Sequence, residues 1–168
     1  LRVRIMQRLF ECEGDVPVAP KPWCRHLNIR FNALPRDAAS KALAEKRGIY
    51  RRLDTPQYAA FVRSCRAFLC TRSPADLVSP RYFECMLSRT LVIAERSDAH
   101  RSIFPEGCMI EFGDVAEFQD RLLAATEPGA ADAILDRARR EAAARHTWDR
   151  RIATLLHHLS RSLSAAAA

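Results

Sequence analysis

Glu84 is a charged residue inside an otherwise apolar helical pattern, in the segment SPRYFECMLSRTLVIAE that covers residues 79–95. Ser79 followed by Pro80 is typical of a helix start, because serine caps a helix and proline suits its first turn. A helix start presents unpaired backbone N–H groups and the positive end of a dipole, and both attract anions. Arg81 adds a guanidinium group that suits phosphate. The segment therefore predicts an anion site with a carboxylate one turn further along the helix.

The residues alone allow two interpretations of Glu84. Because Glu84 and Arg81 are three residues apart, they share a helix face, and the carboxylate could reach a ligand beside the helix start. A carboxylate there can accept two hydrogen bonds from a cis-diol such as that of a ribose. The alternative is an ion pair between Arg81 and Glu84 within the helix, which stabilises a surface helix only slightly.

The elements around this segment alternate between helical patterns and short apolar strands. Apolar residues recur at helical spacing from Tyr58 to Cys65, and the apolar run at 91–94 is typical of a buried strand. From residue 56 the predicted order is helix, strand, helix, strand, strand, helix, helix. Such alternation predicts a parallel sheet covered by helices on both faces. We therefore expect an α/β, Rossmann-like fold.

The 168-residue chain is long enough for one domain with a sizeable core. Prolines punctuate residues 1–54, which are predicted to be an irregular, basic segment that could form the start of the sheet domain. Residues 55–163 are predicted to form the sheet domain and to end in a long helix, and residues 164–168 are predicted to fray. No apolar run approaches the roughly 18–20 residues that span a bilayer, and the start of the chain does not resemble a signal peptide.

Helix starts are predicted at two places besides Ser79. Thr55 before Pro56 matches an N-cap followed by a first-turn proline. Asp114 and Glu117 form a D-x-x-E capping pattern.

The last helical region is predicted to run from about 131 to 163, with an apolar stripe along its second part. Within it, Thr147 is expected to act as an N-cap, and Trp148 is expected to pack the final helix onto the sheet. His146 is expected to have a structural role.

Ligands of open α/β sheets bind at the carboxyl ends of the strands, beside helix starts. Two predicted loops meet that description, TRSPADLVSP at 71–80 and ERSDAHRSIFPEG at 95–107. Arg72 could add positive charge from the first loop. His100 lies in the second loop, where it either contacts phosphate or sugar or is a solvated loop residue.

The formal net charge is +7, and the excess lies in residues 1–60. A basic segment of this kind can bind nucleic acid, an anionic membrane surface or an acidic partner, or it can reflect an arginine-rich composition. The six cysteines form no C-x-x-C pair, and a chain with this much core favours free thiols in a reducing, cytoplasmic compartment. Cys12, Cys24 and His26 could provide part of a metal site, but their spacing matches no standard zinc pattern.

Three segments in the second part of the chain occur in a recognisable order. They are Arg81-Tyr82-Phe83-Glu84, Glu111-Phe112 through Phe118, and His146-Thr147-Trp148 with Arg151. Together they resemble the C-terminal domain of GT-B glycosyltransferases, in particular the CgeB/YkvP-like spore-protein group. The resemblance covers roughly residues 55–160.

This resemblance implies a role for each candidate site residue. Glu84 would bind the ribose of a nucleotide-sugar donor, and the helix start from Ser79 to Arg81 would lie near its diphosphate or sugar. Asp76, eight positions before Glu84, would match a second acidic residue of related retaining enzymes, or it is an ordinary loop aspartate. The family places a glycine turn where this chain has Ser88 and Arg89, which puts tight donor binding in doubt.

The resemblance also implies a function for the whole chain. It would be the donor-binding half of a glycosyltransferase with an unknown acceptor. The acceptor and, in inverting enzymes, the catalytic base usually come from a separate N-terminal GT-B domain. The sequence has no D-x-D pair, so neither a metal nor a cofactor is expected. One alternative is a noncatalytic interaction domain with the same fold. A weaker one is nucleic-acid binding through the basic N-terminal segment, which no nucleic-acid-binding motif supports.

Overall fold

The computed structural model describes residues 53–73 and 75–166, together with Ala38 and Ala42. The basic N-terminal segment predicted for residues 1–54 therefore lies almost wholly outside the described residues. All statements of structure below concern the described part of the chain.

The core of the fold is a parallel sheet of three strands in the order β1-β2-β3. The strands are β1 (Ala67–Cys70), β2 (Leu91–Glu95) and β3 (Ile110–Phe112), and β2 pairs with both neighbours. Each pair is joined by a helix, as parallel strands require. The α/β, Rossmann-like fold expected from the sequence is confirmed.

β2 is buried on both faces, because Leu91, Val92, Ile93 and Ala94 are each at most 2% exposed. Since successive side chains of a strand point to opposite faces, this strand contributes to two separate cores. Val92 and Ala94 belong to one hydrophobic cluster, and Leu91 and Ile93 belong to the other.

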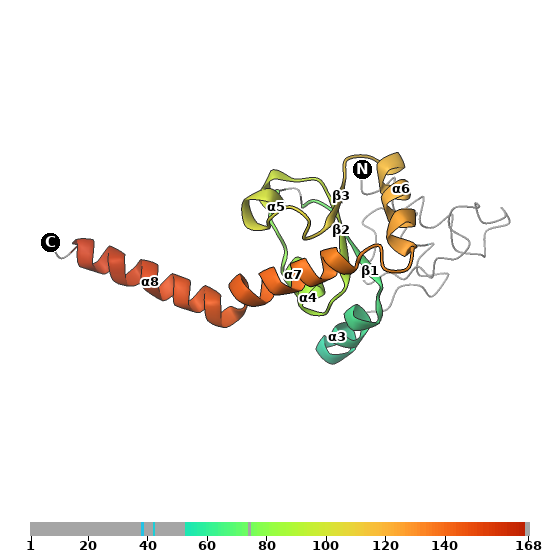
Figure 1. Ribbon diagram of the computed structural model, residues 1–168. Coiled ribbons are helices and arrows are strands. Elements are labelled where there is room, and N and C mark those ends of the chain that lie inside the picture. The colour runs from blue at the N-terminus through green and yellow to red at the C-terminus, as the bar shows by residue number, and fades with distance from the viewer. Residues whose placement is uncertain (1–37, 39–41, 43–52, 74, 167–168) are drawn as a thin grey trace, which may run out of the picture.

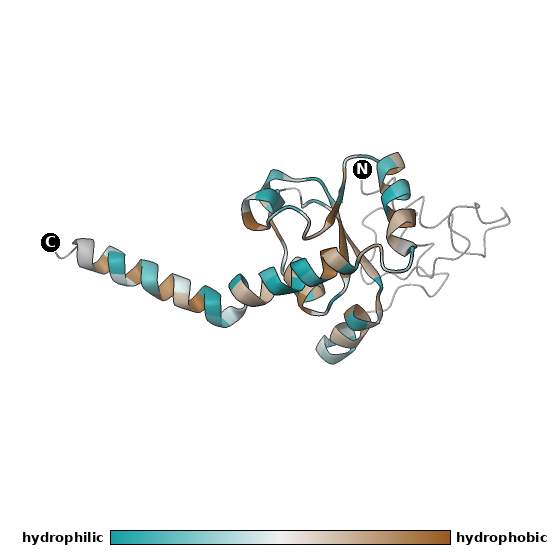
Figure 2. Cartoon of the chain, in the orientation of Figure 1, coloured by the Kyte–Doolittle hydropathy of each residue, from teal (hydrophilic) through white to brown (hydrophobic). Residues whose placement is uncertain are grey.

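Helices cover the two faces of the sheet (Figure 1). On the first face α4 (Pro80–Leu87) contacts β1, β2, α3 (Thr55–Ser64) and α7 (Asp132–Arg145). On the second face α6 (Val115–Thr126) contacts β3, and Phe118 of α6 packs edge-on against Phe112. Figure 2 shows the strands as the most hydrophobic part of the ribbon, with the helices mixed in character.

The predicted helix starts are right at α6 and displaced by one residue at α3. Asp114 caps α6 by accepting a hydrogen bond from the backbone N–H of Glu117 at 2.8 Å. The N-cap of α3 is Asp54, and the prediction of Thr55 was wrong. Asp54 and Gln57 form a reciprocal capping box. The threonine before the proline also matched a helix start, and it led the prediction to the wrong residue.

The loop predicted at 95–107 contains a short helix, α5 (Asp98–Ile103), so the prediction of an unbroken loop was wrong. Ser97 begins this helix, because its hydroxyl accepts a hydrogen bond from the backbone N–H of Ala99 at 3.1 Å. A serine followed by an aspartate in the first turn is a normal helix start. This start signal is present in the sequence, but the helix that follows it has only six residues.

The last helical region is divided in two at His146 and Thr147, giving α7 and α8 (Trp148–Ala166). The Thr147 hydroxyl accepts a hydrogen bond from the backbone N–H of Arg150 at 3.4 Å, as expected of an N-cap. The predicted packing of Trp148 onto the sheet was wrong, because this side chain is 74% exposed.

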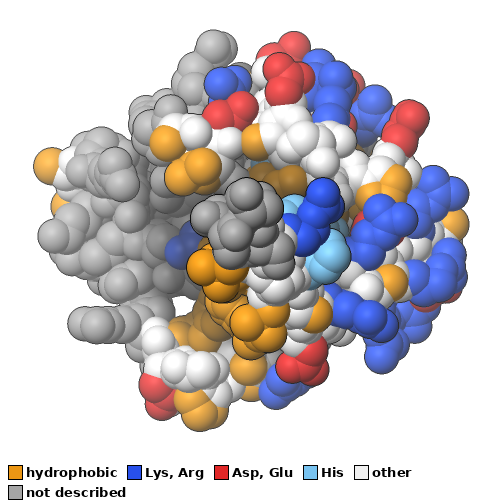
Figure 3. Space-filling view, turned by 90° about the vertical axis from the view of Figure 1, so that its left-hand side faces the viewer, with side chains coloured by type: hydrophobic (Ala, Val, Ile, Leu, Met, Phe, Trp, Pro, Cys, Tyr) orange, Lys and Arg blue, Asp and Glu red, His pale blue; other side chains and the backbone are white. Residues whose placement is uncertain are grey.

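α8 extends away from the sheet, as Figure 1 shows. Its apolar stripe is exposed in the described structure and consists of Ile152, Leu155, Leu156, Leu159 and Leu163. Figure 3 looks toward this end of the molecule and shows basic side chains gathered along one flank. α7 and α8 carry exposed arginines at positions 137, 139, 140, 145, 150 and 161.

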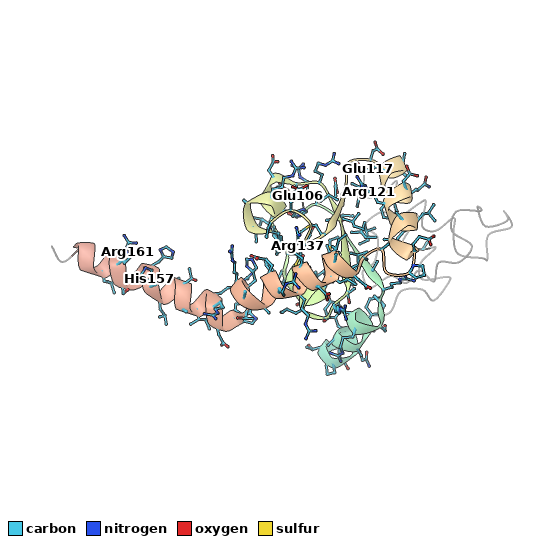
Figure 4. All side chains as sticks on the ribbon, in the orientation of Figure 1. Glu106, Glu117, Arg121, Arg137, His157 and Arg161 are labelled. Atoms are coloured by element: carbon cyan, nitrogen blue, oxygen red, sulfur yellow. The ribbon has the colours of Figure 1, made fainter. Side chains whose placement is uncertain are left out.

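Polar side chains fix the loops that flank β3 (Figure 4). Arg137 of α7 donates to the backbone carbonyl of Glu106 at 2.9 Å. Glu117 of α6 accepts from the backbone N–H of Gly113 at 2.7 Å and also pairs with Arg96 and Arg121. The connections into and out of β3 are thus held by side chains as well as by the strand pairing.

The end of α4 forms the tight turn that the family resemblance assigns to glycine. The backbone N–H of Arg89 donates to the carbonyl of Met86 at 3.1 Å, and that of Thr90 donates to Cys85 at 2.8 Å. This is the Schellman pattern, in which the residue after the cap takes a left-handed conformation. Arg89 has that conformation, with φ 58°. The turn is therefore present without its glycine.

Aromatic and imidazole rings fill the space beside α4. Tyr82 lies 4.6 Å from the ring of His100, and Phe83 lies 5.1 Å from Phe104 and 5.0 Å from His146, measured between ring centroids. His146 thus has the structural role predicted for it. Burial lowers the pKa of both histidines below the ordinary value, and Glu111 beside His100 and Glu141 beside His146 oppose that shift.

Replacing Arg89 by glycine should stabilise the domain, because a side chain in the left-handed conformation costs about 1–2 kcal/mol and glycine avoids this cost. The ion pair of Arg89 with Asp136 at 3.0 Å is lost, but both side chains are about half exposed, so it contributes little. We expect Arg89→Gly to raise the melting temperature by about 2–4 °C. Arg89→Ala loses the same ion pair and keeps the strain, so a stabilised Arg89→Ala variant would contradict this explanation.

Acidification should destabilise the domain through His100. Because its folded pKa is lowered, the unfolded chain binds more protons than the folded chain as the pH falls through the ordinary histidine pKa of about 6.5. The free energy of unfolding, measured by urea denaturation at pH 7 and pH 5, should fall with acid by up to about 1.4 kcal/mol per pH unit. His100→Phe keeps a ring beside Tyr82 and should flatten this dependence, whereas Ser102→Ala on the same helix should not. Equal pH dependence of His100→Phe and the parent chain would contradict the assignment.

Candidate functional site

The candidate site lies at the carboxyl ends of β1 and β2. The loop that follows β1 leads directly into the start of α4, and Glu95 is the last residue of β2. The backbone N–H of Arg72 donates to a carboxylate oxygen of Glu95 at 3.0 Å, which ties the loop to the neighbouring strand. The fold therefore brings the candidate residues of the first loop to the edge where α/β sheets bind ligands.

Arg72, Asp76 and Ser97 form a hydrogen-bonded cluster at this edge. Arg72 Nε lies 3.0 Å from Asp76 Oδ1, and the Ser97 hydroxyl donates to the same oxygen at 2.5 Å. Ser97 is only 4% exposed and also begins α5. Asp76 has a left-handed backbone with φ 51°, which aspartate tolerates better than most residues.

The start of α4 has the features expected of an anion site. Ser79 is the N-cap residue by backbone geometry, but its hydroxyl makes no capping hydrogen bond. Pro80 has no backbone N–H, and that of Tyr82 donates to the Ser79 carbonyl at 3.2 Å, so among residues 80–82 the N–H of Arg81 is the backbone donor left for an anion. Arg81 is exposed at the same end of the helix.

Glu84 is exposed on α4, whereas its neighbours Phe83 and Cys85 are buried. Within the described residues no ion pair joins Glu84 to Arg81, so the intrahelical pair considered above does not form. Glu84 Oε2 instead accepts a hydrogen bond from the Tyr58 hydroxyl of α3 at 3.1 Å. Burial, and next the charge of Glu84, raise the pKa of Tyr58, so this hydroxyl stays a donor at neutral pH.

The charges of Glu84 and Arg81 both shift the pKa of Cys70, the last residue of β1. Burial raises the pKa of Cys70 to about 12, while Arg81 lowers it and Glu84 raises it by smaller amounts. Both charges are therefore close enough to the end of β1 to affect it. Cys70 itself is a buried, protonated thiol at neutral pH, so it is not a nucleophile.

His100 is separated from solvent, because it is 3% exposed in α5 and packs against Tyr82. The alternative of a solvated loop histidine was wrong, since α5 turns the side chain inward. Three buried polar atoms in this region have no hydrogen-bond partner in the structure, namely His100 Nδ1, Tyr82 Oη and Glu111 Oε1. Because His100 is buried, we expect it to support the residues at the edge rather than to contact a ligand directly.

The described residues contain no group of three histidine, cysteine or acidic side chains that could hold a metal ion. Cys12, Cys24 and His26 lie outside the described residues. Among the helices that the structure describes, none has the length and apolarity needed to cross a bilayer.

Sequence reasoning did not single out Tyr58, Glu95 and Ser97 as site residues, although Glu95 and Ser97 lie in the loop at 95–107 that was predicted at this edge. Ser97 carried a signal, because serine before an aspartate predicts a helix start next to the strand end. Glu95 ends an apolar run, which marks it only as the limit of a strand. Tyr58 falls on an apolar helix face, and its hydrogen bond to Glu84 depends on how α3 and α4 pack.

One solved structure with a similar fold is sucrose-phosphate synthase from Thermosynechococcus elongatus, with a TM-score of 0.60 and 18% sequence identity. The match covers 99% of this chain but only 44% of that chain, so this chain spans less than half the length of that protein. Identity at this level supports the fold alone. Among curated proteins, no sequence matches this chain.

A comparison with protein-family models is more specific. The model described as glycosyl transferase-like matches residues 5–157, which is most of the chain. The matched region includes both strands and the α4 segment that form the candidate edge. This chain is a member of the glycosyl transferase-like family.

Proposed function

We propose that this chain is the donor-binding half of a glycosyltransferase, which moves a sugar from a nucleotide-sugar to an acceptor. The observation that carries the proposal is the placement of Arg81 and Glu84 on an uncapped helix start at the carboxyl edge of the sheet. Family membership supports the reaction class, and the edge supports a ligand that has both an anionic group and hydroxyl groups.

The diphosphate of the donor would bind at the start of α4. Arg81 offers its guanidinium and its backbone N–H there, and the Ser79 hydroxyl is a further donor. Arg72 adds a second guanidinium from the loop. Negative charge grows on the departing nucleoside diphosphate during glycosyl transfer, and fixed positive groups stabilise it. These groups supply the positive charge, so the proposal includes no metal.

The ribose of the donor would bind Glu84. Tyr58 occupies one of the acceptor positions on Oε2 and holds the carboxylate in place, while the remaining positions are available to a cis-diol. We assign Asp76 to the same donor site, and we assign His100 to its support. The exposed position of Glu84 beside buried Phe83 favours a ligand-facing role over a core role.

The acceptor and the catalytic base would come from an N-terminal GT-B domain, so the chain by itself would bind donor and be inactive. One observation supports this division: the match covers less than half of the sucrose-phosphate synthase chain. The CgeB/YkvP-like subgroup remains a prediction that rests on the three sequence segments. The buried free thiols at positions 70, 85 and 108 are consistent with a reducing, cytoplasmic compartment.

The alternative of a noncatalytic interaction domain rested on the missing glycine turn. Arg89 makes that turn with the left-handed backbone that glycine would provide, so this reason for loss of binding no longer holds. Nucleic-acid binding rested on the basic N-terminal segment, which lies almost wholly outside the described residues. No observation on the described residues favours either alternative.

Nucleotide binding should be measurable on this chain by titration calorimetry with UDP, GDP and their sugar conjugates. A ligand that binds only the folded state stabilises it by about 2.7 kcal/mol at a hundred times its Kd, so the melting temperature should rise with ligand concentration. The proposal is wrong if none of these ligands binds at millimolar concentration.

Glu84→Gln should weaken binding of the preferred nucleotide by about 5- to 150-fold, which corresponds to about 1–3 kcal/mol for hydrogen bonds to a charged group. The loss should disappear for the 2′,3′-dideoxy form of the same nucleotide, because that ligand lacks the diol. Glu106→Gln, an exposed glutamate of the loop that leads into the start of β3, is the matched control and should bind normally. An equal loss for both forms of the nucleotide would mean that Glu84 does not contact the ribose.

A further inference from the structure

Asp76 is held through one of its two carboxylate oxygens. Both of its close side-chain contacts fall on one oxygen, Oδ1, which is 2.5 Å from the Ser97 hydroxyl and 3.0 Å from Arg72 Nε. Its backbone N–H donates to the carbonyl of Ser73 at 3.0 Å, which closes a turn within the loop. The carboxylate is therefore tied to its own loop and to the start of α5.

Arg72 is held at two points and remains half exposed. Its backbone N–H is bound to Glu95 at 3.0 Å, and its Nε is bound to Asp76, while its side chain is 51% exposed. A guanidinium group has five N–H donors in a rigid plane, so binding through Nε leaves the two terminal nitrogens available. Those two nitrogens are the pair that binds phosphate oxygens in a bidentate way.

Resting on the proposed donor-binding function, we infer that Asp76 is a positioning residue that fixes Arg72 in the orientation in which it binds the donor diphosphate. The buried hydroxyl of Ser97 fixes Asp76 in turn. A long, flexible arginine loses conformational entropy when a ligand orders it, and an arginine that is already ordered does not. In this arrangement Asp76 raises affinity without touching the donor, which differs from the direct donor contact that the family resemblance implies.

The test is a double-mutant cycle on the whole chain, read by titration calorimetry with whichever of UDP and GDP binds the parent chain and with the corresponding nucleoside. Asp76→Gly removes the carboxylate and tolerates the left-handed backbone at this position, where φ is 51°. We expect it to weaken nucleoside diphosphate binding about tenfold and to leave nucleoside binding unchanged. In an Arg72→Met background the same substitution should have no further effect.

Asp76→Asn keeps an oxygen that can accept from both Ser97 and Arg72, and asparagine also tolerates a left-handed backbone. It should restore most of the affinity lost in Asp76→Gly. If the glycine variant is poorly folded, the affinity of Asp76→Asn can be measured in its place. A loss that persists in the Arg72→Met background, or that extends to the nucleoside, would overturn the inference and favour a direct contact or a general loss of loop structure.

The two proposals fail in different ways. If the parent chain binds neither nucleoside diphosphate at millimolar concentration, the proposed function fails and this inference fails with it. If the parent chain binds and Asp76→Gly binds equally well, only the positioning role of Asp76 is overturned.

Discussion

Burial of β2 on both faces is the constraint on which the rest of the structure depends. A strand whose neighbouring side chains enter different cores cannot shift by one residue without exchanging the two sets. Leu91 and Ile93 pack with the α6 side, and Val92 and Ala94 pack with the α4 side. The register of β1 and β3 against β2 then decides which loops meet at the carboxyl edge.

The candidate site follows from that register and from two local devices. One device is the pair of bonds that join the loop after β1 to the end of β2 and the start of α5, through Glu95 and Ser97. The other is the Schellman turn at Arg89, which joins α4 to β2 through the three residues 88–90. Together they set both ends of α4, so the helix start faces the edge while Phe83 and Met86 remain in the core.

The sequence was sufficient for the fold because apolar periodicity and strand burial are properties of single segments. The strands, the face of α4 that carries Glu84 and the cap at Asp114 were all predictable in this way. What it missed depends on contacts between segments: Tyr58 meets Glu84 only through the packing of α3 on α4, and Ser97 meets Asp76 only across two loops. Trp148 was misplaced for a related reason, since an aromatic residue at a helix start predicts burial without indicating what covers it.

α8 differs from the remainder of the domain in how it is held. Arg151 near its start lies over the ring of Phe83 at 4.2 Å, but every described side chain from Ile152 to Leu163 is exposed. Local backbone hydrogen bonds are then the main support of most of this helix, and such helices open without global unfolding. We therefore expect α8 to open before the sheet domain, which unfolds as a unit. A far-ultraviolet signal, which reports all helices, should begin to fall before a near-ultraviolet signal from the buried aromatic rings.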